Sequence, residues 1–191
     1  MKSADAARRA QRVPAAAATP PDRGVREVTS RVAAAGLTDF AKREQRVYRL
    51  SCNFLGGKRF WHRRLASRSD VHSAIVSGIP YASLLFLVEQ MQELGEDDIA
   101  KTLGISARTL RRQSEAPGKR MPADLASKTW LFAETLAKAT EILGGKEEAE
   151  LWMARPAMGL DGKKPIDLMR TVQGAELVHD FLGRLEYGVY T

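Results

Sequence analysis

Hydrophobic residues in the stretch 122–143 recur at alternating steps of three and four, so they share one face of a helix: Leu125, Phe132, Leu136, Ala139 and Leu143. Thr129 fills the remaining position of this face. Pro122 stands where the helix would begin, and Gly144-Gly145 where it would end. No long stretch alternates strictly between apolar and polar residues, as a half-buried β-strand would. The pattern predicts an all-α fold with a long helix over residues 122–143.

Capping and stop residues predict shorter helices before and after the long one. The expected segments are 70–76, 80–94, 147–153, 165–169 and 171–187. Asp70 is expected to cap the first of these helices and Thr171 the last. Gly174 lies inside the last helix, where glycine costs about 1 kcal/mol relative to alanine, so we expect it at a close helix contact.

Residues 97–112 have the spacing of a helix-turn-helix. Ala100 is small where a second helix must cross closely, and Gly104, four residues later, supplies the positive φ that turns the chain. Ser106 can cap the second helix, and Leu110 has the position of an inward residue. The motif is the expected core of a domain over residues 70–121.

The outward face of the second helix is rich in arginine. A step of about 100° per residue from the inward Leu110 turns Arg108 and Arg112 outward. Arginine on such a helix can pair with guanine edges or hold phosphates in the major groove. The alternative is a helical hairpin that only packs. The expected DNA-binding residues are Ser106, Arg108, Thr109, Arg111, Arg112, Lys119 and Arg120.

Charge is distributed unevenly along the chain, whose net charge is +7. Residues 1–70 hold 16 basic and 6 acidic residues, whereas residues 71–191 hold 14 and 17. A basic segment of this kind commonly contacts phosphates. The alternative is a solvated leader without a partner.

Residues 1–30 contain few large apolar residues and are expected to be disordered. Residues 31–68 contain more apolar residues and can dock on the body, but Gly56-Gly57 and nearby basic residues argue against a core of their own. We therefore divide the chain into a basic, disordered or loosely docked leader, a helix-turn-helix domain, a connecting helix and a C-terminal domain, at residues 1–69, 70–121, 122–143 and 144–191.

The sequence lacks the patterns of an enzyme. The single cysteine, Cys52, excludes an internal disulfide framework and suits a reducing cytosol. The three histidines show no metal-ligand spacing, and no phosphate-binding glycine loop is present. The longest apolar run, residues 79–88, is about half the length that spans a bilayer. We expect a cytoplasmic, non-enzymatic protein with no metal site, cofactor or membrane partner.

The C-terminal region resembles antitoxins of the Xre/MbcA/ParS type. The resemblance rests on several segments in the expected order: residues 142–153, Pro156, and residues 160–169, 171–178 and 182–189. The stretch from Asp70, with Gly78-Ile79-Pro80, resembles the family's region ahead of its helix-turn-helix. The resemblance covers residues 70–191 and leaves residues 1–69 outside.

This resemblance implies an antitoxin of a type II toxin–antitoxin system. Its partner would be a RES-domain toxin that degrades NAD⁺ or transfers ADP-ribose, and the C-terminal domain would cover the toxin's active site. The resemblance also implies a homodimer within a larger toxin–antitoxin hetero-oligomer, repressing its own operon. It places the final residues at the mouth of the toxin's active site: Glu186, Tyr187, Gly188, Val189, Tyr190 and Thr191.

Two further residues are candidates for the toxin interface by their type. Trp152 lies among methionines, and aromatic and Met side chains are enriched at interface cores, although it can also fill the domain's own core. Arg184 can pair with acidic groups of the toxin or remain solvated.

Two other functions remain open. A stand-alone transcriptional regulator would use the C-terminal domain only to dimerise. A toxin-neutralising protein could instead use the helix-turn-helix purely as a dimer scaffold.

Overall fold

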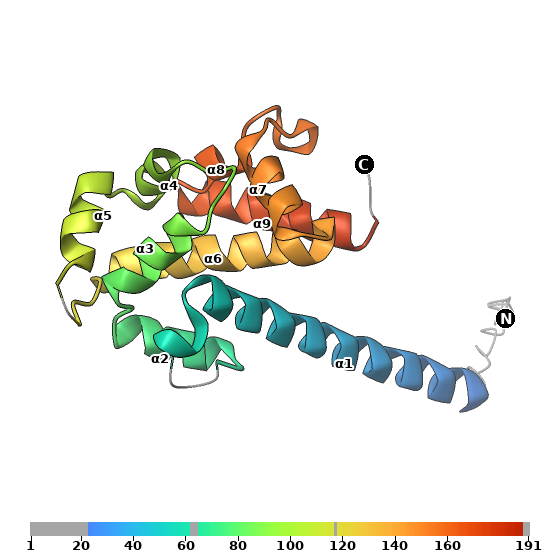
Figure 1. The fold of residues 1–191 in the computed structure, drawn as a ribbon. Helices are drawn as coiled ribbons and strands as arrows, with labels where there is room; N and C mark the ends of the chain where they lie inside the picture. Colours follow the sequence, from blue (N-terminus) through green and yellow to red (C-terminus); the bar gives the residue numbers. More distant parts are fainter. Residues whose placement is uncertain (1–22, 62–64, 117, 189–191) are drawn as a thin grey trace, which may run out of the picture. The chain divides into compact units, whose positions relative to one another are not determined.

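The computed structural model describes residues 23–61, 65–116 and 118–188 of the chain (Figure 1). The chain divides into two compact units, Met1–Asp39 and Phe40–Thr191. Every regular element of the described residues is helical, which confirms the all-α prediction. The elements are α1 (Arg23–Phe54), η1 (Gly57–Arg59), α2 (Arg68–Val76), α3 (Tyr81–Glu89), α4 (Glu96–Leu103), α5 (Ala107–Ser114), α6 (Ala123–Leu143), α7 (Lys146–Ala154), η2 (Met158–Leu160), α8 (Pro165–Leu168) and α9 (Val172–Glu186).

The long helix α6 is the centre of the second unit. It contacts α2, α4, α7 and α9, and Figure 1 shows α7 and α9 on one side of it and α2 on the other. Phe132 and Leu136 are fully buried, as the spacing predicted. Ala133 and Ala137 are fully buried as well, and their small side chains let neighbouring helices approach closely. Because α6 is buried on most of its circumference, it joins the chain's segments into one core.

Part of the expected leader belongs to this core. Val47, Tyr48 and Phe54 of α1 and Leu55 beyond it are buried. The Tyr48 ring lies 6.2 Å from that of Trp130 on α6. The structure therefore differs from the expected boundary at residue 69, since the compact unit begins at Phe40. Basic residues alternate with the apolar ones along α1, and this obscured the buried face in the sequence.

The helix caps follow the sequence with one correction. Thr171 caps α9 by accepting a hydrogen bond from the amide of Gly174 (3.1 Å), as expected. A Cβ at Gly174 would overlap the carbonyl oxygen of Leu168, which explains the glycine. The prediction that Asp70 caps the first helix was wrong. Ser67 is that cap, and the Asp70 carboxylate accepts from the amide of Ala66 (3.0 Å), the residue before the cap.

A buried carboxylate joins α7 to the loop before α4. Glu150 is only 1% exposed, and its Oε2 accepts hydrogen bonds from the amides of Gln92 (2.7 Å) and Glu93 (2.8 Å). Its Oε1 lies 3.0 Å from Nζ of Lys146, which also donates to the carbonyl of Gln90. This arrangement satisfies both backbone donors and neutralises a charge that burial would otherwise make costly.

A second contact joins α4 to α8, since the Thr102 hydroxyl lies 3.1 Å from the carbonyl oxygen of Ile166 and shares its single proton between that oxygen and the carbonyl of Asp98 (2.9 Å). The segments 70–121 and 144–191, drawn from the sequence as separate domains, thus share one hydrophobic core.

His179 of α9 is held in one tautomer against α6. Thr135 Oγ1 donates to the carbonyl of Leu131 (2.8 Å), so it accepts from Nε2 of His179 (2.7 Å). Nδ1 of His179 then accepts from Nζ of Lys138 (3.3 Å). Burial, with the nearby Lys138 charge, lowers the pKa of His179 to about 4. The imidazole is therefore neutral at physiological pH.

We expect His179 to make folding stability depend on mildly acidic pH. Its pKa is lowered in the folded state from 6.5, so its contribution is complete above about pH 6.5 and is lost as the pH falls toward about 4. The loss is at most about 3 kcal/mol in the free energy of unfolding. Urea unfolding at pH 7.0 and 4.5 should show this drop in the wild type and a smaller one in His179→Gln. His72→Gln, exposed on α2, is the control. Equal drops in wild type and His179→Gln would contradict the assignment.

Candidate functional site

The segment α4–turn–α5 has the local features that the sequence predicted. Gly104 ends α4 with φ 73°, a left-handed conformation in which a side chain would be strained. Ser106 caps α5, its hydroxyl accepting from the amide of Thr109 (3.0 Å). Ala100 and Leu110 are buried, so each faces the core as expected. The turn therefore presents the opposite side of α5 to solvent.

The three arginines of α5 differ in whether they form an ion pair within the protein. Arg108 and Arg112 are exposed, and neither has an ion-pair partner among the described residues. Arg111 is paired with Glu96 at the start of α4: its Nε donates to Oε1 (2.9 Å) and its Nη2 to Oε2. The Glu96 carboxylate raises the pKa of Arg111. Arg108 and Arg112 are thus the arginines of α5 available to an external anion.

Several of the remaining DNA-binding candidates form side-chain hydrogen bonds within the protein. Arg120 donates from Nη1 to the carbonyls of Gly78 and Ser77 (3.4 Å to Ser77), so it closes the end of α2. Lys119 is exposed. The hydroxyl of Ser106 donates to that of Thr109 (2.8 Å), which ties both to the helix start. Sequence spacing gave no sign of the partners of Arg120, because they lie 42 and 43 residues earlier in the chain.

The C-terminal part of the chain carries an aromatic patch, which we define as Trp152, Phe181 and Arg184. The rings of Trp152 and Phe181 are stacked, with centroids 6.1 Å apart and planes 7° from parallel. Cζ of Arg184 lies 5.7 Å from the centroid of Phe181. Trp152 and Phe181 are half-buried and Arg184 is exposed. The structure thus brings together Trp152 and Arg184, two predicted toxin-binding residues, through a third residue that sequence reasoning missed.

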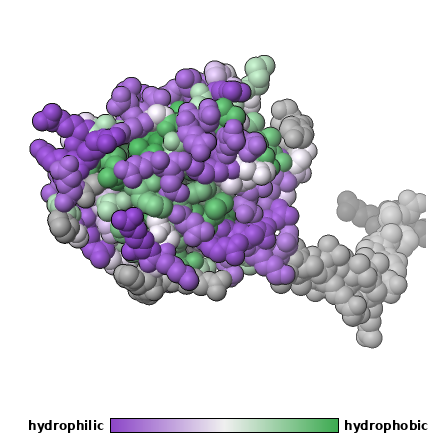
Figure 2. Space-filling model, in the orientation of Figure 1, coloured by the Kyte–Doolittle hydropathy of each residue, from purple (hydrophilic) through white to green (hydrophobic). Residues whose placement is uncertain are grey.

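Exposed apolar residues lie beside the aromatic patch. Met158 is 95% exposed and precedes Gly159, where a Cβ would overlap the Phe181 ring. Leu177, one turn before Phe181 on α9, is 55% exposed. The four-residue spacing of Leu177 and Phe181 was the sequence signal that could have revealed Phe181. On the face drawn in Figure 2, hydrophobic residues surface in separate patches between hydrophilic ones.

The end of α9 is anchored to α1. Glu186 Oε1 accepts from Nη1 of Arg43 (2.7 Å). Tyr187 is exposed, and Gly188 has a left-handed φ of 66°. The predicted toxin-binding residues Val189, Tyr190 and Thr191 lie outside the described residues, as do residues 1–22. The prediction that residues 1–30 are disordered was wrong for residues 23–30, because they form the first turns of α1.

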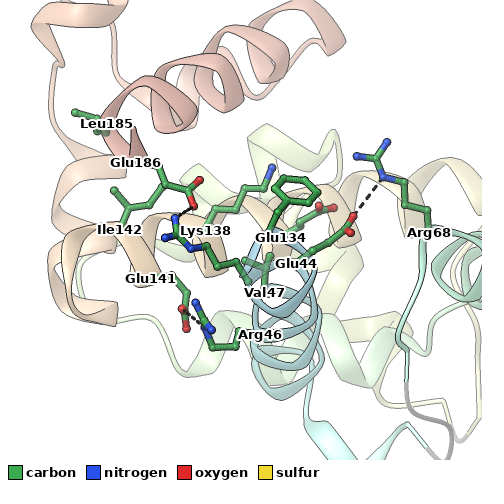
Figure 3. Close-up of a pocket in the computed structure, with 12 residues that line it drawn as sticks. Glu44, Arg46, Val47, Arg68, Glu134, Lys138, Glu141, Ile142, Leu185 and Glu186 are labelled. Carbon is green, nitrogen blue, oxygen red and sulfur yellow. Dashed lines mark hydrogen bonds and ion pairs between the residues drawn. The ribbon is translucent and has the colours of Figure 1, made fainter. Parts of the chain in front are cut away.

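A pocket of about 410 Å³ lies beside this anchor (Figure 3). Figure 3 shows Arg46 and Glu141 pointing toward each other, 2.9 Å apart, and Arg68 facing Glu44 at 3.5 Å. Basic and acidic residues alternate on its walls, with apolar residues between them. The lining residues are Phe40, Arg43, Glu44, Arg46, Val47, Arg68, Glu134, Lys138, Glu141, Ile142, Leu185 and Glu186.

Within the described residues, no group of three or more His, Cys, Asp or Glu side chains could hold a metal ion. Among the same residues, no helix is both long and apolar enough to cross a membrane. Burial raises the pKa of the Cys52 thiol to about 11. This thiol is therefore protonated at neutral pH and poorly suited to act as a nucleophile.

Comparison with known proteins matches residues 138–188 to the antitoxin Xre/MbcA/ParS C-terminal toxin-binding domain. The chain is 27% identical over 125 residues to antitoxin Xre of Photorhabdus laumondii, covering 65% of this chain and 83% of that protein. It is 34% identical over 95 residues to antitoxin Xre of Yersinia enterocolitica, covering 49% of this chain and 64% of that protein. The matched segment contains the aromatic patch and the end of α9. Residues 138–188 are therefore similar to the toxin-binding domain of Xre/MbcA/ParS-type antitoxins, and a larger part of the chain is similar to two proteins described as antitoxin Xre.

Proposed function

We propose that this antitoxin neutralises a RES-domain toxin, which degrades NAD⁺ or transfers ADP-ribose, by covering its active site, and that it represses its own operon through α4 and α5. The observation that carries the toxin-binding half is the exposed aromatic patch within the matched toxin-binding domain, residues 138–188. The protein acts by binding rather than by catalysis.

The chemistry of the aromatic patch supports a protein partner. Trp and Arg dominate the residues that contribute most to binding energy at interfaces, and methionine is enriched there. Stacking holds Trp152 and Phe181 in place before binding, so little side-chain freedom is lost when the toxin docks. Met158 and Leu177 extend the exposed apolar surface around the patch.

The end of the chain supports the part of the proposal that concerns the active site. Tyr187 is exposed just beyond α9, and Gly188 follows it. We propose that residues 186–191 reach the mouth of the toxin's active site, where Tyr190 and the carboxylate of Thr191 would occupy a nucleotide pocket.

The exposed face of α5 supports the DNA-binding half. Arg108 and Arg112 are free to contact bases or phosphates, with Lys119 as a further phosphate contact. Arg111 and Arg120 are engaged by the protein itself, so we assign them mainly to positioning α5 and the segment after it. A homodimer would place two such helices about one turn of DNA apart, or a multiple of it.

Replacing Arg108 and Arg112 with alanine should weaken binding to the DNA upstream of the antitoxin gene by at least tenfold, because each contributes a charge-assisted contact. Arg111→Ala should have a smaller effect because Glu96 already holds that side chain. An electrophoretic mobility shift at fixed salt measures both, with Arg155→Ala, exposed at the end of α7, as the control. Unchanged affinity of the double variant would contradict the assignment of α5.

Disrupting the aromatic patch should weaken the complex with the product of the adjoining gene. We expect Trp152→Ala to raise the Kd about thirtyfold, as for a residue central to an interface. Arg184 is exposed, so Arg184→Glu leaves the core intact. We expect this variant to lose about tenfold in affinity while remaining folded, which separates an effect on binding from an effect on folding. Val76→Ala, equally apolar and exposed on α2, is the matched control.

Calorimetry on the purified pair and rescue of growth on co-expression provide the measurements. If wild type and Arg184→Glu bind alike and rescue alike, the aromatic patch is not the toxin-binding surface. If the adjoining gene product does not bind the wild type at all, the proposed toxin partner is wrong.

A further inference from the structure

The helix α1 makes two ion pairs with the matched toxin-binding domain, residues 138–188. Arg43 pairs with Glu186 at the end of α9 (2.7 Å), and Arg46 pairs with Glu141 near the end of α6 (2.9 Å). Both carboxylates lie within the matched toxin-binding domain, residues 138–188, whereas the arginines lie 143 and 95 residues before their partners in the chain. The toxin-binding domain is therefore held at two points by α1.

The pocket between these pairs is built equally by the two parts. Five of its lining residues belong to α1 and five to the matched domain. The chain beyond Glu186 leaves from the rim of this pocket, because Leu185 and Glu186 line it (Figure 3). A toxin that covers the end of α9 thus meets the rim that α1 provides.

On the α1 side, the rim of the pocket carries an apolar side chain that is largely exposed to solvent. Phe40 is 53% exposed although it lines the pocket, with half-buried Leu185 and Ile142 on the other wall. Nζ of Lys138 has no carboxylate within ion-pair distance among the described residues, and its contact there is the neutral ring of His179. An exposed aromatic ring at the rim of a pocket is typical of an interface with another protein.

We propose that residues 40–46 of α1 form part of the toxin-binding surface, with Arg43 positioning the end of α9 through Glu186 and Phe40 contacting the toxin directly. This inference rests on the proposed function. It extends the toxin-binding surface beyond residues 138–188, to a helix that the family resemblance left unexplained.

A charge exchange tests the positioning role of Arg43. Arg43→Glu and Glu186→Arg should each raise the Kd for the adjoining gene product at least tenfold, and the double variant should bind at least threefold more tightly than Glu186→Arg alone, because it restores the ion pair although it still changes a residue of the proposed interface. The pair is partly exposed and contributes little to folding, so each single variant should remain folded. Arg49→Glu is the matched control, since Arg49 is exposed on α1 and does not line the pocket. Wild-type affinity in Arg43→Glu, or no rescue in the double variant, would overturn the positioning role.

Hydrogen exchange on the free antitoxin tests the same role without the toxin. The amides of residues 183–188 should exchange about tenfold faster in Arg43→Glu than in wild type, and the double variant should restore protection. Unchanged exchange in Arg43→Glu would overturn the inference while leaving the proposed function in place. If the adjoining gene product does not bind wild type but exchange responds as expected, the anchor stands and the proposed function fails.

Phe40→Ala separates direct contact from positioning. It should weaken toxin binding about tenfold without altering exchange at residues 183–188. If Phe40→Ala binds as wild type, α1 does not contact the toxin. A shift of the free antitoxin from dimer to monomer in Phe40→Ala, with toxin affinity unchanged, would assign this rim to a second copy of the chain and overturn the proposal.

Discussion

The structure depends on one buried carboxylate. Glu150 of α7 accepts two backbone hydrogen bonds from the loop between α3 and α4 and pairs with Lys146, with almost no exposure to solvent. Removing one member of such a buried pair costs about 3–5 kcal/mol, a large share of the stability of a domain of this size. The carboxylate therefore fixes where α4 begins relative to α7, and with it the position of the arginine-rich α5.

This arrangement makes α5 and the matched toxin-binding domain parts of one packed unit. Thr102 of α4 lies 3.1 Å from the carbonyl oxygen of Ile166 in α8, and α6 contacts both α4 and α9. The aromatic patch and the outward face of α5 are thus presented by a single core. Any change that toxin binding imposes on α7 or α9 would reach α4 through the same contacts. The shared core explains how these two surfaces are held together.

The local structure could be predicted from the sequence, but the contacts that assemble it could not. Gly104, Ser106 and Thr171 fill their roles as expected, because turns and caps depend on residues close in sequence. Nothing in the sequence distinguished Glu150 from an acidic residue on the solvent-exposed face of a helix. The partners Arg111–Glu96 and Arg43–Glu186 are 15 and 143 residues apart, with no periodicity to reveal them. Phe181 was missed for a related reason, since its importance comes from its stack with Trp152 on another helix.

Native-state hydrogen exchange in Glu150→Gln tests most directly whether these parts form one unit. The substitution keeps the shape of the side chain but removes its charge, while Glu147→Gln, exposed on the same helix, serves as the control. We expect the amides of α4 and α7 to lose protection together, by at least tenfold, because both depend on the same carboxylate. Faster exchange confined to Gln92 and Glu93, with α4 and α7 unchanged, would contradict the account.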